Sequence, residues 1–183
     1  MKPFTSVFNT LCTPVCVKTL CTFLLVLALP WSVASGAQAQ VELRIDELSP
    51  LDRQFMARQR ATIEDLAALK LGRRINGDTP NDLQILQLLL DRRIVRADQT
   101  QELQAMGVIM GDLLASDLDM QWVVYVDALG RSRALRYKDT DEYLFPITMI
   151  SRRIEVGNDT PIAVIYENAY NIIDPLRQEL PFR

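Results

Sequence analysis

The chain has 183 residues, with 20 basic and 23 acidic side chains, a formal net charge of -3 and no histidine. Its three cysteines, Cys12, Cys16 and Cys21, all lie in the N-terminal segment. Beyond that segment the sequence therefore excludes Ser–His and Cys–His nucleophile systems, thiol redox chemistry and the usual zinc sites. It also has no phosphate-binding glycine loop and no dinucleotide fingerprint. We expect no cofactor and no metal ion.

The N-terminal segment has the pattern of a secretory signal peptide. Lys2 and Lys18 precede the apolar run 19–29, and Ala37 and Ala39 occupy the two positions that signal peptidase reads. A membrane anchor is the alternative, but the apolar stretch contains a proline and is shorter than the about 20 residues that cross a bilayer. We predict cleavage after Ala39 and a periplasmic or secreted mature chain with no membrane span.

The mature chain is acidic. Cleavage after residue 39 removes two lysines and no acid, which leaves 18 basic against 23 acidic residues, a net charge of -5. This balance argues against nucleic acid and anionic membrane surfaces as partners. The remaining 144 residues have the size of one domain.

Residues 40–78 are predicted to form an N-terminal arm and a helix. Apolar and polar residues alternate over 40–48, which indicates a short strand or an extended arm. Ser49 and Pro50 then supply a helix cap and a first-turn proline, and Gly72 ends the apolar pattern. We expect a helix over about 50–71.

Two further helices follow in the sequence. Thr79 is the expected cap of a helix over about 80–92, whose leucine-rich stripe predicts burial. Asp98 or Thr100 is expected to cap a third helix to about Ser116, which is apolar almost all round and so belongs in the middle of the domain. Gly107 and Gly111 lie four residues apart on this helix, where missing side chains let another element approach closely.

The next segment predicts a small antiparallel sheet. Residues 121–127 are rich in aromatic and β-branched side chains, Gly130 marks a turn, and 132–137 is the returning strand of a hairpin. Residues 143–145 form a possible third strand. With about five helices packed on this sheet, the fold class is α+β.

The C-terminal part is predicted as two helices and a tail. Pro146 opens a helix to about Glu155, and Pro161 opens the last helix, which ends near residue 173. We expect 79–173 to form the α+β domain and 174–183, which contains two prolines, to be an irregular tail.

Asp112 is the first candidate for a functional residue. It is an acid in an otherwise apolar helix, and a buried acid with a raised pKa often marks a functional site. A hydrolase would use it with a second carboxylate such as Asp127. The alternative, which the sequence favours, is that Asp112 lies at a solvent-facing edge or pairs with Arg136 or Arg152, and serves only the structure.

A second candidate is a binding cleft for an anion or a carboxylate, lined by Arg136 and Tyr137 at a strand end and by Thr148 and Arg152 after it. Solvated surface charge is the alternative. The acids of 139–142 lack the ligand spacing of a calcium loop, so no metal site is predicted there.

Several short motifs between residues 79 and 169 together resemble an uncharacterised bacterial family, domain of unknown function 3806. They are Asp82-Leu83-Gln84 to Leu90, Leu103 to Val108, Gly111-Asp112, Trp122-Val123-Val124, Leu135-Arg136-Tyr137 and Phe145 to Ser151. The resemblance implies a compact α+β domain and no established activity.

Three classes of function stay open. The sequence favours an exported module that binds a protein or a small anionic ligand. A carboxylate-dependent hydrolase without histidine or cysteine would need Asp112 in a cleft beside a second acid. A structural subunit of an envelope assembly would show a contiguous exposed apolar patch.

Overall fold

The computed structural model describes residues 43–178. The predicted signal peptide and its cleavage site lie outside the described residues, as do residues 179–183. The described part contains five α-helices, two other short helical segments and four strands. In chain order these are β1 (Arg44–Glu47), α1 (Pro50–Leu66), η1 (Ala67–Leu71), α2 (Thr79–Asp91), α3 (Thr100–Leu118), β2 (Met120–Asp127), β3 (Gly130–Tyr137), β4 (Tyr143–Leu144), η2 (Pro146–Thr148), α4 (Ser151–Ile154) and α5 (Ile162–Gln178).

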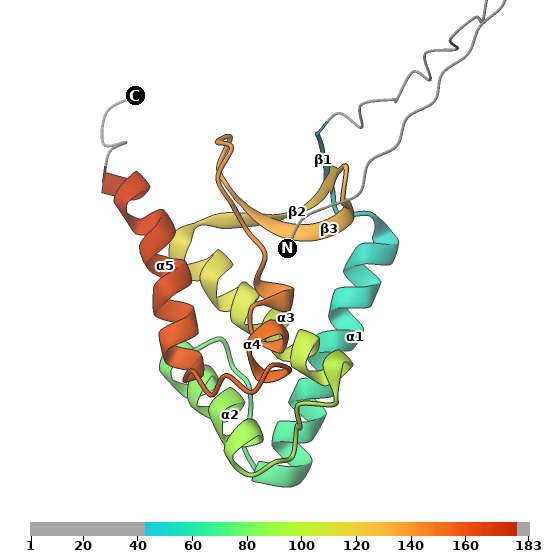
Figure 1. Ribbon diagram of the computed structural model, residues 1–183, viewed down its shortest axis with the longest axis vertical. Coiled ribbons are helices and arrows are strands. Elements are labelled where there is room, and N and C mark those ends of the chain that lie inside the picture. The colour runs from blue at the N-terminus through green and yellow to red at the C-terminus, as the bar shows by residue number, and fades with distance from the viewer. Residues whose placement is uncertain (1–42, 179–183) are drawn as a thin grey trace, which may run out of the picture. The chain divides into compact units, whose positions relative to one another are not determined.

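The four strands form one antiparallel sheet in the order β1-β2-β3-β4. The sheet lies above the helices (Figure 1), so only one of its faces packs on the core. Val124, Leu135 and Leu144 are buried on that inner face, and their neighbours Tyr125, Arg136 and Tyr143 point outward because side chains alternate along a strand. The predicted α+β architecture, with about five helices and an antiparallel sheet, is confirmed.

The predicted helix over 50–71 is confirmed as one helical run made of α1 and η1. Ser49 and Asp52 form a capping box at its start, with the Asp52 amide 3.2 Å from the Ser49 hydroxyl. The last turn, Ala67–Leu71, widens to a π-helix. Gly72 then takes a left-handed conformation (φ 64°), which ends the run.

Two of the predicted helix caps are wrong. Asp78, and not Thr79, caps α2, because its carboxylate accepts a hydrogen bond from the Asn81 amide. At α3 the cap position is Gln99, which makes no side-chain capping bond. Its amide oxygen instead accepts a hydrogen bond from the Arg96 backbone at 3.0 Å. The helices themselves begin within one residue of the expected positions.

Helix α3 is the centre of the domain, as its apolar sequence predicts. It contacts α1, α2, α4, α5, η2 and the sheet. An added Cβ atom at Gly107 would lie 2.5 Å from the Ile147 carbonyl oxygen, and one at Gly111 would lie 2.5 Å from the Trp122 ring. Both glycines therefore allow the close approach that their spacing predicts.

The predicted helix from Pro146 to Glu155 is wrong in detail, because it is split into η2 and α4. The chain after Pro146 makes a tight turn in which the Met149 amide donates to the Pro146 carbonyl at 3.1 Å. Close packing of η2 against Gly107 and Gly111 fixes this turn. The chain enters α4 only after Ile150, which is fully buried.

The predicted tail is also corrected, because α5 continues to Gln178 with Pro175 inside it. A proline within a helix removes one backbone hydrogen bond. Tertiary contacts offset this loss: Leu176 packs against the core, and the Arg177 guanidinium donates to the Asp117 carbonyl at 2.9 Å.

Candidate functional site

Asp112 lies on α3 and faces α1, where Arg60 forms a two-pronged ion pair with it. Arg60 Nη2 lies 2.7 Å from Asp112 Oδ1, and Arg60 Nε lies 2.5 Å from Oδ2. The Trp122 indole nitrogen donates a third hydrogen bond to Oδ1 at 2.9 Å. Asp112 therefore pairs with Arg60, and not with Arg136 or Arg152 as expected.

The glycine beside Asp112 makes this arrangement possible. Trp122 points inward from β2, and its ring reaches Asp112 by crossing the place that a side chain at residue 111 would fill. The carboxylate is about one-third exposed, at 32%, and Arg60 is 33% exposed. The hydrogen bonds from Arg60 to Asp112 raise the pKa of the guanidinium above its ordinary value, so Arg60 stays charged.

A small pocket of about 180 Å³ opens beside this ion pair, and both apolar and charged residues line it. Its lining residues are Arg60, Glu64, Ile75, Gly77, Asp82, Ile109, Asp112, Leu113 and Ser116. Asp82 is fully buried and accepts hydrogen bonds from the Asn76 and Gly77 amides at 3.1 and 2.8 Å. Its role is to hold the turn before α2.

Asp127, the second carboxylate of the hydrolase hypothesis, does not line this pocket. It ends β2 and accepts hydrogen bonds from the Leu129 and Gly130 amides at 2.8 and 3.1 Å, which closes the hairpin turn. It lies five positions along the strand from Trp122, a distance of about 16 Å. The geometry does not give Asp112 and Asp127 a shared site.

The four residues predicted to line an anion cleft do not share one surface. Tyr137 is 1% exposed and points into the core, whereas Arg136 points to the outer face of the sheet, where its Nε donates to the Thr140 carbonyl at 2.8 Å. Thr148 is half-buried at the end of η2, and Arg152 is exposed on α4. Of the four, Arg136 and Arg152 present charge to solvent.

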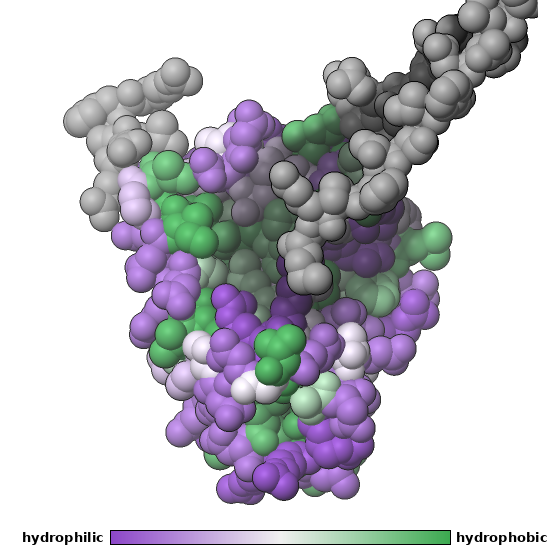
Figure 2. Space-filling view, in the orientation of Figure 1, coloured by the Kyte–Doolittle hydropathy of each residue, from purple (hydrophilic) through white to green (hydrophobic). Residues whose placement is uncertain are grey.

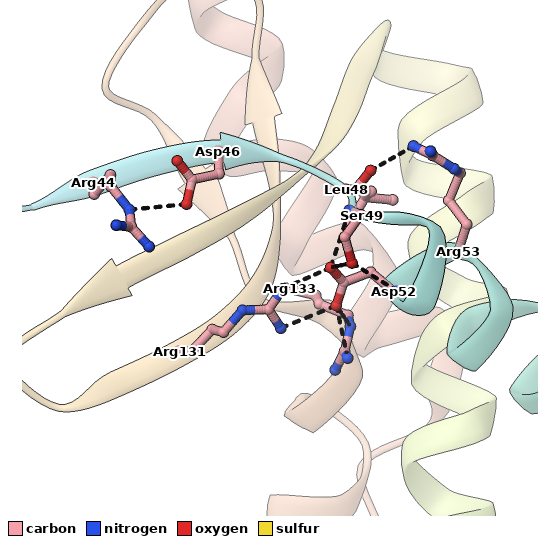
Figure 3. Close-up of polar contacts among 8 residues, drawn as sticks. All are labelled: Arg44, Asp46, Leu48, Ser49, Asp52, Arg53, Arg131 and Arg133. Carbon is pink, nitrogen blue, oxygen red and sulfur yellow. Dashed lines mark hydrogen bonds and ion pairs between the residues drawn. The ribbon is translucent and has the colours of Figure 1, made fainter.

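A polar cluster that the sequence interpretation missed joins α1 to β3 (Figure 3). The Asp52 side chain is 2% exposed and forms ion pairs with both Arg131 and Arg133. Arg131 Nη1 and Nη2 lie 2.9 and 2.6 Å from its two oxygens, and Arg133 Nε lies 3.0 Å from Oδ1. The Ser49 backbone and hydroxyl complete its shell at 3.1 and 2.6 Å.

The Arg131 hydrogen bonds hold the pKa of the Asp52 carboxyl well below its usual range, and those from Ser49 add to this effect against the opposing effect of burial. Arg133 also stacks over the Phe55 ring, 4.1 Å from its centre. The sequence signals for this cluster were the Ser49-x-x-Asp52 spacing of a capping box and two arginines at alternate strand positions. No local sequence pattern, however, predicts that the start of α1 contacts β3.

The outer face of the sheet carries a second feature that was not predicted, a group of aromatic rings. Tyr125 of β2 lies 5.0 Å from the Tyr143 ring and 5.2 Å from the Phe145 ring, both edge-to-face. The Arg136 guanidinium lies 6.0 Å from the Tyr143 ring centre. We call Tyr125, Arg136, Tyr143 and Phe145 the outer aromatic surface.

Other features of the described residues limit the chemistry. No group of three or more histidine, cysteine, aspartate or glutamate residues within 43–178 could hold a metal ion. None of the helices in this part of the chain is long and apolar enough to cross a membrane. Figure 2 shows apolar residues in separate patches and in a hollow below the sheet, among a largely polar surface.

Comparison with known proteins supports the fold and leaves the activity open. Residues 82–166 match the model of a family described as a domain of unknown function, DUF3806, which confirms the resemblance seen in the sequence. A crystal structure from Bacteroides thetaiotaomicron VPI-5482 is similar, with a TM-score of 0.66 and 16% identity. The match covers 73% of this chain and 49% of that one, so the chain matches about half the length of its structural neighbour. No curated protein matches.

Proposed function

We propose that this chain is an exported binding module that recognises a partner protein through the outer aromatic surface of its sheet. The observation that carries the proposal is the group of rings formed by Tyr125, Tyr143 and Phe145 beside Arg136, on a sheet face that no helix of the described residues covers (Figure 1). Tyrosine, phenylalanine and arginine are enriched at protein–protein interfaces, with tyrosine and arginine prominent among the residues that contribute most affinity.

The exposure of these side chains fits such a role. Phe145 is 36% exposed, and Tyr125, Tyr143 and Arg136 are each partly exposed. Their edge-to-face contacts fix the rings in place before a partner arrives. A pre-ordered surface loses less side-chain entropy on binding, which favours affinity.

Export is part of the proposal and is supported by the N-terminal pattern, with its lysines, apolar run and small residues before position 40. The acidic mature chain supports a protein or a small ligand as partner, rather than nucleic acid. A periplasmic or secreted location follows from the same pattern.

The hydrolase hypothesis has less support. A general acid or base must reach a substrate proton in a suitable protonation state. Asp112 already accepts hydrogen bonds from Arg60 and Trp122, and Asp127 is used by the hairpin turn. The hydrolase hypothesis needs Asp112 and Asp127 to act together on one substrate, and each carboxylate instead bonds to other groups.

The structural-subunit hypothesis also has less support, because the most exposed large apolar side chains lie on different elements. They are Leu51 on α1, Leu69 on η1, Leu129 in the hairpin turn and Val156 after α4. Isolated exposed apolar residues are normal on soluble domains. The rings of Tyr143 and Phe145, by contrast, both contact the Tyr125 ring, and all three side chains are at least partly exposed.

Affinity capture tests the proposal. The full chain, carrying a C-terminal tag, is expressed in its native host, recovered from the envelope, and sequenced from its N-terminus to test cleavage after Ala39. We expect the wild-type protein to retain a reproducible protein partner and Phe145→Ala to lose most of it. Leu69→Ala is the matched control, because Leu69 is 80% exposed and lies on η1, outside the sheet.

Thermal melting of both variants establishes that they are folded. Equal capture by wild type and Phe145→Ala would contradict the assignment of the binding surface. A wild-type protein that captures nothing reproducibly, and that is found uncleaved in the cytoplasm, would contradict the proposed function as a whole.

A further inference from the structure

The strand β3 has an open edge along five of its eight residues. Its other neighbour, β4, pairs only with Leu135 and Arg136. Within residues 43–178 no strand pairs with Gly130–Ala134 on that side. An unpaired stretch of strand backbone is a template for pairing with another chain.

A hydrogen bond next to the open edge shows which residues of β3 direct their backbone N–H and C=O groups toward it. The Tyr137 amide donates to the Glu142 carbonyl at 3.1 Å, on the β4 side of the strand. Every second residue of a strand directs its N–H and C=O groups to the same side. Arg131 and Arg133 therefore present two donors and two acceptors at the open edge, while their side chains lie on the inner face.

The charge at this edge is positive. Arg131 and Arg133 share the single carboxylate of Asp52 (Figure 3), and their side chains are still 46% and 23% exposed. From Gly130 to Lys138 the chain carries four basic residues and no acid. This charge favours an acidic occupant, because complementary potentials select a partner and orient it.

The outer aromatic surface meets the same edge from the opposite face. Tyr125 belongs to β2, yet its ring lies 5.0 Å from the ring of Tyr143 on β4, so the two rings bridge over β3. A strand added along β3 would place alternate side chains on the two faces of the sheet. One set would meet the arginines, and the other set would lie beside the aromatic rings.

We propose that the open edge of β3 binds an extended segment of the partner protein as an added strand, and that this segment alternates acidic and apolar residues. The inference rests on the proposed function and names the chemistry of the partner. The main chain of the segment pairs with Arg131 and Arg133, its acidic side chains face their guanidinium groups, and its apolar side chains face Tyr125 and Phe145.

A synthetic peptide tests the inference. The probe is the labelled heptapeptide Glu-Val-Glu-Val-Glu-Val-Glu, titrated with the full purified protein and followed by fluorescence anisotropy. We expect it to bind at least about tenfold more tightly than the same peptide with lysine in place of glutamate. Two further versions of the glutamate peptide are N-methylated, one at the odd-numbered amides and one at the even-numbered amides, so that one of them loses the N–H donors that face β3. We expect that version to bind at least about tenfold more weakly than the unmethylated peptide.

Two protein variants locate the site. Arg131→Pro removes an amide donor from the open edge, where proline is tolerated because that N–H does not pair within the sheet. We expect it to lose the acidic peptide and to melt at a lower temperature than the wild type, because the substitution also removes the ion pair between Arg131 and Asp52. Arg152→Gln, an exposed arginine on α4, is the matched control and is expected to bind normally.

Equal binding of the glutamate and lysine peptides, or unchanged binding of both N-methylated versions, would overturn the inference even if Arg131→Pro proved unfolded. The proposed function has a separate readout. Partner capture that needs Phe145 but is not reduced by an excess of the acidic peptide would leave the binding module standing and remove only the added strand.

Discussion

Replacing Asp52 with asparagine tests the energetic role of the cluster that joins α1 to β3. The substitution keeps the shape of the side chain and removes its charge, so Arg131 and Arg133 lose their shared anion. It also weakens the capping box, because the Ser49 amide and hydroxyl both donate to the carboxylate.

The magnitude follows from burial. Removing one partner of a buried ion pair costs about 3–5 kcal/mol, because the other charge stays unpaired. Asp52 is 2% exposed, but Arg131 is 46% exposed and regains water. We therefore expect the lower end, about 3 kcal/mol of unfolding free energy, which corresponds to a decrease of about 10 °C in Tm for a domain of this size.

The stability that the Asp52 ion pairs contribute depends on pH, and the lowered pKa of Asp52 determines the direction of this dependence. Because the Arg131 hydrogen bonds lower that pKa in the folded state, the ion pair stabilises the fold fully above the unfolded pKa of about 4. This stabilisation is lost progressively as the pH falls below about 4 toward the folded pKa. The difference between wild type and Asp52→Asn should therefore shrink in acid.

Urea unfolding followed by circular dichroism near pH 7 and near pH 2.5 measures both effects. Asp98→Asn is the matched control, because Asp98 also pairs with an arginine, Arg96, at 3.1 Å, but on the exposed surface. We expect this control to unfold like the wild type, since exposed pairs contribute little. If Asp52→Asn is no less stable than Asp98→Asn near pH 7, the reasoning about burial is refuted.

Three further substitutions test the packing around α3. Gly107→Ala should lower the free energy of unfolding by about 1–3 kcal/mol, measured by calorimetry, because the added Cβ atom would lie 2.5 Å from the Ile147 carbonyl oxygen. A variant as stable as the wild type would contradict this packing argument. Arg60→Gln should shift the fluorescence of Trp122, whose indole donates to Asp112, and an unchanged spectrum would show that the ion pair does not position that carboxylate. Burial raises the pKa of Tyr166, whose hydroxyl donates to Asp117, so the fold should lose stability as the pH rises above about 10. Tyr166→Phe should remove this alkaline loss, and a variant with the wild-type profile would point to another group.

The features predicted from the sequence were those that local chemistry determines. Ser49 and Pro50 mark the start of a helix and Gly72 marks its end through their own local chemistry. The aromatic and β-branched residues of β2, the turn at Gly130 and the apolar character of α3 likewise predict a hairpin and a central helix from neighbouring residues alone. The two glycines of α3 indicated a close approach but could not identify η2 and Trp122 as the elements that approach.

The features that were missed depend on residues far apart in the chain. Arg60 and Asp112 are 52 residues apart, and Arg131 and Asp52 are 79 residues apart, so no local spacing links either pair. The last turn of α5 contains a proline and was predicted to be irregular. It stays helical because Leu176 and Arg177 make tertiary contacts that no local propensity includes.

Photo-crosslinking within cells tests the central claim, that the outer face of the sheet binds a partner, most directly. A photoreactive phenylalanine analogue is placed at position 145 in one strain and at the exposed position 69 in another. We predict a discrete adduct of higher mass from position 145, in the envelope fraction, and none from position 69. An adduct from position 69 alone, or identical patterns from both, would contradict the claim.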